Sequence, residues 1–358
     1  MKAASGGFRV AVVGASSLLG KELLAVLKER NFPISRLVTP NVLGAQDPDL
    51  PVLDLSDVLE PVVAETDVGE TDLDIVFLAA PLLSGNKKSR TETEESSFLK
   101  SPKRLATAAR CKVIDLSECL AGEAGGALSV PYLDRITAAH PEPGTGVRFF
   151  ISAHPATIIL SGILLRLSAR FPIKSAVGQI FDPVSEIGAQ AIDELQKQTM
   201  NLLSFQKIPQ KVFGTQLAFN LLPRLGHPRG HRTDLASHVQ KEMTEVLSQR
   251  APLPALRAVY GPVFHSLACS LYVELVQPTT IEALTQVLAG APIIVRKASE
   301  GPPSQVDVSG SDEIVVDALA PDGMHAGGVW IWAAADNLRL ATLNSVEIAE
   351  SLSGQARV

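Results

Sequence analysis

The segment FRVAVVGASSLLGKELLAVLKER, residues 8–30, carries the clearest fold signal in the sequence. It opens with the apolar run Val10–Val13 and passes through the glycine turn Gly14–Gly20. The residues that follow carry apolar side chains at helical spacing, at Leu19, Leu23, Val26 and Leu27. A buried strand, a glycine turn and an amphipathic helix form the first unit of a dinucleotide-binding fold, in which the turn directs backbone N–H groups at a phosphate. The sequence therefore predicts an α/β chain that begins with a Rossmann-like domain.

Further apolar runs extend this first domain. SRLVT (35–39), DIVFLAA (74–80) and CKVIDLS (111–117) each predict a strand, and their spacing is typical of a parallel α/β sheet. We expect a dinucleotide-binding-type domain over residues 1–150. Within it, segment 84–104 is polar and mixed in charge, which predicts a mobile surface loop.

From Phe149 onward, strand-like runs alternate with longer helices. The runs are SAVGQIFDPVS (175–185), VYGPVFHSLACSLYVELV (259–276) and GGVWIWAAAD (327–336). The segment that follows Thr233, a predicted helix cap, has an apolar face at helical spacing. We therefore predict an α+β domain over residues 151–335 and a C-terminal helix within residues 336–358.

Composition and charge exclude several classes of partner. The formal net charge of −6 leaves no basic excess to neutralise phosphates, so we expect no nucleic-acid partner. The three cysteines, Cys111, Cys119 and Cys269, are an odd number at unrelated spacings, which favours reduced thiols in a cytoplasmic protein. The most apolar run, Ile158–Leu167, is too short to span a bilayer, so we expect no membrane partner.

The glycine turn has two possible roles. As a cofactor site it would use the residues Gly14, Ala15, Ser16, Ser17, Leu18 and Leu19. However, Ser17 stands where the usual fingerprint has its middle glycine, and a side chain there narrows the approach of a pyrophosphate. The segment after the second strand, residues 36–49, has no acid in place for a ribose hydroxyl and only Arg36 upstream of that position. The turn therefore serves either the fold alone or an NADP site.

Four longer motifs identify a family. They are VAVVGASSLLGKELLAVLKERNFPISRL (10–37), VIDLS (113–117) with SVPYLD (129–134), FNLLPRLG (219–226) and ADNLRLATLNSVEIAE (335–350). In this order the chain resembles aspartate-semialdehyde dehydrogenases over nearly its full length. The resemblance implies a Rossmann-like domain, an α+β catalytic and dimerisation domain, and a C-terminal helix that returns to the first domain. It also implies that Asn337 contacts NADP.

The family's chemistry begins with a cysteine thiolate that attacks the aldehyde. Hydride then passes to NADP, and phosphate releases the acyl group. The cysteine stands in an NPNCSTI-like turn before a helix, and the shared residues Thr157 and Ile158 align it with Pro155. The side chain of proline has no nucleophilic atom. Proline suits the first turn of a helix, however, because it lacks an N–H group. The resemblance therefore implies that the nucleophile is absent.

At the positions that the resemblance aligns with the family's other catalytic residues, this chain also has unsuitable residues. The orienting glutamine, three residues before the serine of an SGAG-like turn, falls on Asp182, and Gln179 would point to the opposite face of its strand. The carboxylate-binding arginine falls on Tyr260. The histidine base falls on Leu267, and His265, two residues earlier, would share a strand face with it.

The phosphate site and the substrate-binding helix also lack a matching side chain. The phosphate-binding arginine falls on Ala121, and the lysine of the substrate-binding helix falls near His238.

Other residues offer alternative chemistry. Cys119 in a loop and Cys269 on a predicted strand are the remaining thiols near the motifs. Ser152, Thr157 and Ser161 lie near His154, and we interpret them as packing or capping hydroxyls. The residues His227, His231 and His238 lie largely in a polar loop without helical i, i+4 spacing, so we interpret them as solvated surface residues and predict no metal site.

Two functions remain open. The first is a catalytically degenerate, Usg-like homologue that keeps the fold and the dimer interface, as a homodimer or as a heterodimer with an active relative. The second is an active NADP-dependent semialdehyde dehydrogenase with a rearranged site, which would need a replacement thiol.

Overall fold

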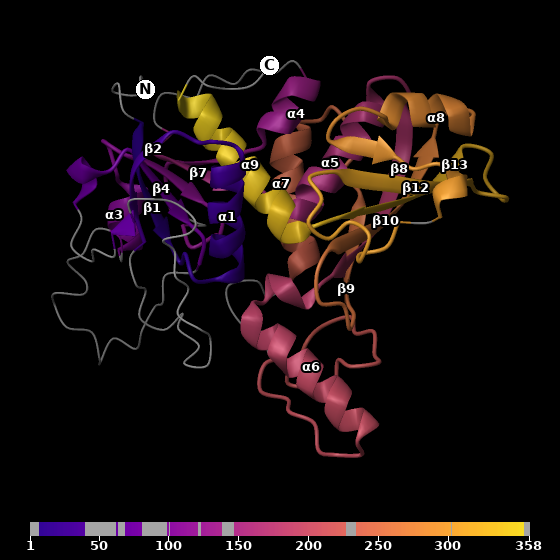
Figure 1. Ribbon diagram of the computed structural model, residues 1–358. Coiled ribbons are helices and arrows are strands. Elements are labelled where there is room, and N and C mark those ends of the chain that lie inside the picture. The colour runs from indigo at the N-terminus through magenta and orange to yellow at the C-terminus, as the bar shows by residue number, and fades with distance from the viewer. Residues whose placement is uncertain are drawn as a thin grey trace. The chain divides into compact units, whose positions relative to one another are not determined.

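The computed structural model describes residues 7–39, 62–63, 69–80, 99, 101–120, 123–137, 147–226, 234–301 and 303–353. Two compact units divide the chain. The first comprises Met1–Asp134, Ala139–Ala153 and Ala341–Val358, and the second comprises Arg135–Ala138 and His154–Leu340. Figure 1 shows the elements of both. No helix among the described residues is long and apolar enough to cross a membrane.

The first unit contains a parallel sheet. Its described strands lie in the order β3-β2-β1-β4-β5-β7-β6, and each pair of neighbours is parallel. Their bounds are β1 Phe8–Val13, β2 Ile34–Val38, β3 Val62–Val63, β4 Ile75–Leu78, β5 Lys112–Asp115, β6 Gly126–Ser129 and β7 Phe149–Ser152. This confirms the predicted Rossmann-like sheet, including the strands expected near residues 35, 75 and 112.

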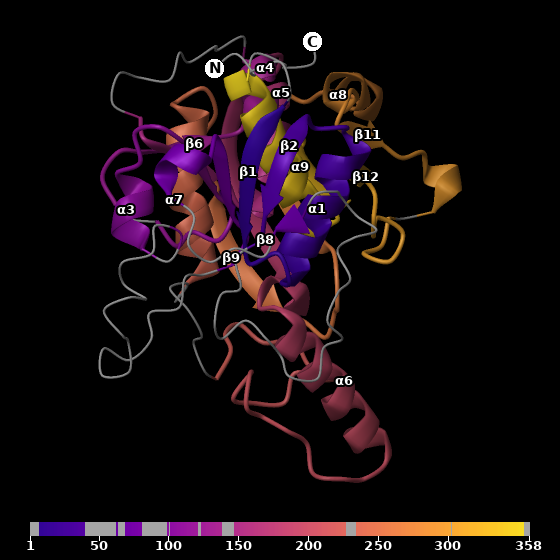
Figure 2. The same ribbon diagram turned by 60° about the vertical axis from the view of Figure 1, so that its left-hand side comes forward.

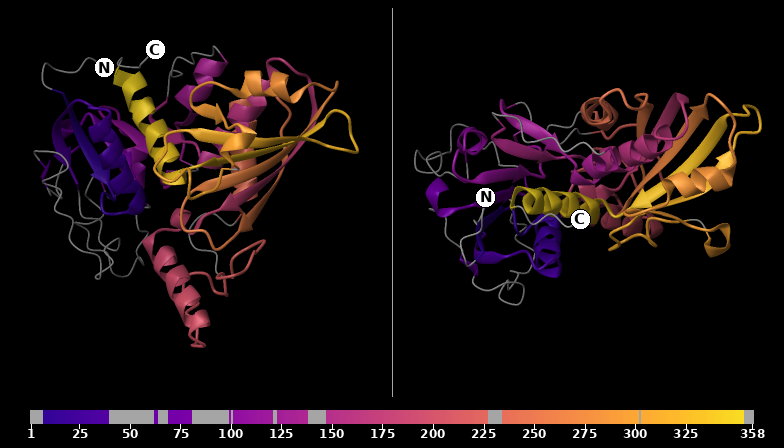
Figure 3. Two further views of the ribbon diagram at one scale, coloured as in Figure 1. Left: turned by 45° about the vertical axis from the view of Figure 1, so that its right-hand side comes forward. Right: turned by 90° about the horizontal axis from the view of Figure 1, so that it is seen from above.

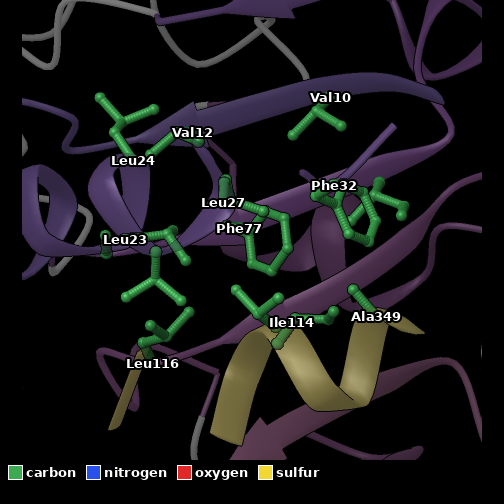
Figure 4. Close-up of a cluster of buried hydrophobic side chains, with 14 of the residues drawn as sticks. Val10, Val12, Leu23, Leu24, Leu27, Phe32, Phe77, Ile114, Leu116 and Ala349 are labelled. Atoms are coloured by element: carbon green, nitrogen blue, oxygen red, sulfur yellow. The ribbon is translucent and has the colours of Figure 1, made fainter. Parts of the chain in front are cut away.

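The helices of this unit follow from the same sequence patterns. They are α1 Leu18–Glu29, α3 Pro102–Ala106, the start of α4 Pro131–Ile136, the short η2 Glu70–Asp72, and α9 Asn337–Ser353 from Ala341 onward. Figure 4 shows Leu23 and Leu27 of α1 facing Phe77 and Ile114 of the sheet, with Ala349 of α9 nearby. Most of the predicted loop 84–104 lies outside the described residues.

The second unit is built on a mixed sheet. Its described strands lie in the order β11-β12-β13-β10-β8-β9. The pairs β11–β12 and β8–β9 are parallel, and the other neighbouring pairs in this order are antiparallel. Their bounds are β8 Ile173–Asp182, β9 Ala255–Tyr260, β10 Leu267–Leu275, β11 Ile293–Val295, β12 Ile314–Pro321 and β13 Gly328–Ala335. Together with the first unit, this confirms the predicted mixed α/β fold.

Helices pack against this sheet and extend from it. They are α5 Pro155–Ser168, α6 Ala189–Leu203, α7 Leu235–Leu247 and α8 Ile281–Leu288, with the short turns η4 Val184–Glu186 and η5 Ala298–Glu300. Helix α5 packs on β8 and β10 and contacts α7 and α8, and Figure 3 shows it beside the sheet. Helix α6 and the loop after it point away from the sheet (Figure 2).

Two local predictions are wrong. The run 259–276 is not continuous strand: residues 261–266 separate β9 from β10, because Pro262 lacks an N–H group and Ser266 has a φ of +70°. His265 therefore lies outside the strand and does not share a face with Leu267 by two-residue spacing. Helix α7 is capped by Asp234, which accepts the Ala236 N–H at 3.1 Å, instead of by Thr233.

Candidate functional site

The strand ends bring the predicted site positions together in the second unit. Asp182, the last residue of β8, pairs with Tyr260, the last residue of β9. Leu267 begins β10, and the pairing of Ala268 with Phe181 places it next to Asp182. These three positions therefore lie at one end of the sheet, where strand ends commonly carry functional side chains.

The helix α5 begins beside this sheet end. Its cap is His154, whose Nδ1 accepts the Ala156 N–H at 3.1 Å, and Pro155 occupies the first helical position. Proline suits that position because its missing N–H would have no helical partner. Both residues are buried. Pro155, the position that the resemblance aligns with the cysteine, thus stabilises the helix start and offers no reactive atom.

Helix α7 supplies a carboxylate to the same helix start. Glu242, 7% exposed, accepts the His154 backbone N–H at 2.9 Å and the Thr157 hydroxyl at 2.5 Å. A negative charge at a helix N-terminus is favourable because of the helix dipole and the unpaired N–H groups there. The start of α5 therefore has a carboxylate of the chain itself beside it.

A second acidic group lies close to His154. Glu186 Oε2 in η4 lies 3.9 Å from His154 Nε2, and its Oε1 accepts an N–H of Asn337 at 2.9 Å. The amide oxygen of Asn337 accepts the Ser266 N–H at 3.0 Å and the Ser185 hydroxyl at 3.2 Å. Asn337, named above as a cofactor residue, is fully buried, and its amide keeps one further N–H to donate.

The prediction that His238 is a solvated surface residue is wrong. The side chain of His238 is 23% exposed, and its Nε2 lies 3.3 Å from Glu242 Oε1, four residues further along α7. Its ring packs edge-on against His154 with the ring centroids 6.2 Å apart. It is therefore a paired, largely covered residue instead of a solvated one. His227 and His231 lie outside the described residues, as does Ala121.

The three cysteines, which are the alternative nucleophiles, are buried or half-buried. Cys269 on β10 is fully buried, and burial, followed by the nearby Asp182 charge, raises the pKa of its thiol far above the usual range. Cys111 is also buried, and Cys119 is half-buried. Because the thiolate is the reactive form, Cys269 is unsuited to attack an aldehyde at neutral pH.

The hydroxyl groups near His154 are engaged or buried. Ser152 Oγ accepts an N–H from Asn344 at 2.9 Å, and Thr157 donates to Glu242. Ser161 is fully buried within α5. Gln179 is exposed on β8 whereas Asp182 is buried, so the two side chains lie on opposite faces as predicted.

The glycine turn in the first unit closes tightly on its strand. Gly14 has a φ of +83°, and a Cβ atom there would lie 2.4 Å from the Ala80 Cβ. Ser17 caps α1: its Oγ accepts the Gly20 N–H at 2.9 Å and donates to the Ala79 oxygen at 2.9 Å. Its hydroxyl thus stabilises the turn. Ser16 is exposed and Leu18 is half-buried at the start of the helix.

Replacing Gly14 by alanine is expected to lower the free energy of unfolding of the first unit by about 2 kcal/mol. Alanine is strained at the positive φ of this position, and its Cβ would also overlap with the Ala80 side chain. Cys111, which is buried in this unit, reports its unfolding, so the measurement is the urea concentration at which Cys111 becomes accessible to alkylation. Gly323→Ala is the control, since a Cβ there meets nothing within 4 Å. Equal midpoints for the two variants would contradict the proposed role of the turn.

Comparisons with known proteins agree with this architecture. Residues 164–340 match the model of the semialdehyde dehydrogenase dimerisation domain. The aspartate-semialdehyde dehydrogenase of Rickettsia conorii is 28% identical over 356 residues, which cover 96% of this chain and 97% of that protein. A USG-1 protein homolog of Pseudomonas aeruginosa is 27% identical over 349 residues and covers 96% and 97% of the two chains.

A solved structure extends the match to three dimensions. It is that of a "probable aspartate-semialdehyde dehydrogenase" from Pseudomonas aeruginosa, with a TM-score of 0.77 and 26% identity, covering 97% of this chain and 98% of that one. The fold and the matched domain make the chain similar to the semialdehyde dehydrogenase class of proteins. Its relatives include aspartate-semialdehyde dehydrogenases and a USG-1 protein homolog.

Proposed function

We propose that this chain is a catalytically degenerate member of its family that acts as a dimeric binding or regulatory protein. The observation that carries the proposal is Pro155 at the first position of α5, where the family's turn has its cysteine. Without a thiolate there, no hemithioacetal forms from the aldehyde at this position, and the covalent route has no first step.

The neighbouring positions support the same proposal. Asp182 has no amide N–H to donate to an intermediate, and Tyr260 offers no positive charge to a substrate carboxylate. Leu267 is fully buried and has no proton acceptor. A rearranged enzyme would have to replace all of these roles together with the nucleophile.

We propose NADP as an optional ligand of the first unit. The turn Gly14–Gly20 leads into the start of α1, and a helix N-terminus can accept a phosphate through its backbone N–H groups. Ala15, Ser16, Leu18 and Leu19 would line this approach. Asn337, which the family resemblance adds, is fully buried in the second unit. Residues 40–50, which would contact the 2′-phosphate of NADP, lie outside the described residues.

We propose self-association through the second unit. The family model that matches there is a dimerisation domain. Exposed apolar side chains gather on α6 and the loop after it, namely Met200, Leu203, Phe205, Phe219 and Leu221, with exposures from 59% to 100%. Such side chains are typical of protein interfaces. A homodimer, or a heterodimer with an active relative, would cover them.

The remaining proposals concern domains and compartment. Residues 1–150 would form the dinucleotide-binding part, residues 151–335 the substrate and dimerisation part, and residues 336–358 the segment that returns to the first part. The free thiols, of which Cys111 and Cys269 are buried, fit a reducing cytoplasm. The net charge of −6 fits a protein without a nucleic-acid partner.

The purified chain is expected to show no NADPH formation with L-aspartate β-semialdehyde, NADP and phosphate above a heat-inactivated blank. An active family member measured in parallel shows that the reagents work. A rate that depends on phosphate and on chain concentration would contradict the loss of catalysis.

One observation favours the active alternative. Cys119 is the half-buried thiol among the three cysteines, and Asp115 fixes its turn by accepting the Ser117 N–H at 2.9 Å and the Leu120 N–H at 2.8 Å. If the wild-type chain is active, Cys119→Ser should abolish the rate and Cys269→Ser should leave it unchanged. Retention of activity in both variants would exclude a cysteine mechanism that uses either thiol.

A further inference from the structure

Three potential metal ligands converge where α5 begins and β8 ends. One ligand-type atom from each of His154, Asp182 and Glu186 lies within 4.8 Å of the other two. His154 Nε2 and Glu186 Oε2 are 3.9 Å apart. His154 and Asp182 are buried, and Glu186 is half-buried, so the cluster has one accessible side.

These three residues differ from the family motifs. The residue before the cysteine in the NPNCSTI-like turn is asparagine, and His154 takes that place. Asp182 takes the place of the orienting glutamine. Glu186 follows Ser185 and takes the place of the glycine after the serine in the SGAG-like turn. Separate departures from the motifs thus bring an imidazole and two carboxylates to one point.

We propose that His154, Asp182 and Glu186 bind a divalent transition-metal ion of the Zn²⁺ or Mn²⁺ class. One imidazole nitrogen and two carboxylate oxygens form a ligand set that these ions accept, and three protein ligands leave room for water or a small oxygen ligand. In a tetrahedral zinc site, neighbouring ligand atoms lie about 3.3–3.6 Å apart. The observed spacing therefore needs only small side-chain rotations to close on an ion.

The cap made by His154 opposes metal binding. Because its Nδ1 accepts the Ala156 N–H, the neutral ring carries its proton on Nε2, the atom that faces Glu186. Metal binding at Nε2 moves this proton to Nδ1 and breaks the cap. A single helix cap contributes far less free energy than coordination of an ion by three side chains. The metal should therefore displace the cap, and the Ala156 amide should exchange faster in the metal-bound protein.

Equilibrium dialysis of the chelator-treated full chain against Zn²⁺ and, separately, Mn²⁺ tests this proposal. We expect about one ion per chain at saturation for one of the two metals. Glu186→Gly and Asp182→Gln restore the residue types of the family motifs, so the fold should tolerate them. Because loss of a second-shell partner alone costs 10–100-fold in affinity, loss of a ligand should weaken binding by at least about 100-fold.

Two histidine variants serve as controls. His238→Asn removes the ring that pairs with Glu242, and His325→Asn removes a side chain that pairs with Asp322 at 3.0 Å. Both should bind the metal as the wild type does. Equal affinity of Glu186→Gly and wild type, or loss of binding in His238→Asn alone, would overturn the proposal.

Hydrogen exchange of the wild-type chain gives a second measurement that needs no variant. Faster exchange of the Ala156 amide in saturating metal supports ligation by His154, whereas unchanged exchange contradicts it. This inference rests on the cluster alone and is independent of the proposed loss of catalysis. Metal binding and dehydrogenase activity are separate readouts, so either proposal can fail without the other.

Discussion

Replacing Glu194 by alanine is expected to release the loop that follows α6. Glu194 is 4% exposed, and its carboxylate accepts the backbone N–H groups of Lys211 at 2.8 Å, Val212 at 2.8 Å and Phe213 at 3.0 Å. Val212 and Phe213 are buried, and each buried N–H left without a partner costs about 1–3 kcal/mol. The local structure should lose about 4 kcal/mol, and the three amides should exchange about 10³-fold faster.

The neighbouring acid provides the control for this experiment. Asp193 is 54% exposed and pairs with Lys197 at 2.7 Å on the helix surface. An exposed i, i+4 pair contributes about 0.3–0.5 kcal/mol, so Asp193→Ala should leave exchange of the loop amides nearly unchanged. Equal exchange in Glu194→Ala and wild type would contradict the anchoring role of Glu194.

The loop anchored by Glu194 carries two side chains of the proposed interface, Phe205 and Phe219. Phe205 is fully exposed and Phe219 is 64% exposed, and both hold positive φ angles that the surrounding loop must maintain. If these side chains meet a second copy, Glu194→Ala should weaken the dimer as well as the loop. Sedimentation velocity at several concentrations measures this, and Asp193→Ala should sediment as wild type does.

The fold was predictable because its signals are local. The turn between β1 and α1 combines an apolar run, a glycine and helical spacing within residues 8–30, and the structure has the strand and the helix there. The interruption at residues 261–266 was missed because its surroundings are as apolar as a strand. Pro262 was the signal that could have predicted it, since proline cannot donate to a sheet.

The site could be predicted only in part. Pro155, Asp182, Tyr260 and Leu267 were predicted by motif, and the strand register brings the last three to one sheet end. Glu242 was missed because it lies 88 residues from His154 in the sequence. In the folded chain its carboxylate accepts a hydrogen bond from the His154 backbone N–H. The i, i+4 spacing of His238 and Glu242 was a visible signal of a pair, but only the folded chain places that pair against α5.

Glu186 was missed for a similar reason. It lies 32 residues after His154 in a short turn whose sequence shows no periodic pattern. Its contact with His154 depends on how α5 packs against β8, and sequence spacing does not report such packing. Side-chain clusters built from separate elements therefore need the structure, even where each element is predicted correctly.

Replacing Pro155 by cysteine is expected to restore a thiol without restoring dehydrogenase activity. Removal of the nucleophile from a coupled set of residues costs on the order of 10⁶ in turnover, and the residues of such a set act as a unit. A thiol at the start of α5 would gain from the helix dipole, but the buried Glu242 carboxylate already lies there and disfavours a second negative charge. Alkylation of the denatured chain should detect the new thiol, because position 155 is buried in the folded chain, whereas NADPH formation should stay at the blank level.

Dehydrogenase activity should return only when the residues for the other catalytic roles are restored as well. The variant that combines Pro155→Cys with Asp182→Gln, Tyr260→Arg and Leu267→His should exceed the matched triple variant, which keeps Pro155, by at least about 10²-fold in NADPH formation. Circular dichroism checks that both fold, since Leu267 is fully buried and its replacement strains the core. Activity of Pro155→Cys alone would show that residues already present, with His265 as the first candidate, supply the missing base. In that case the site would lack only its thiol, and the remaining positions would retain a working arrangement.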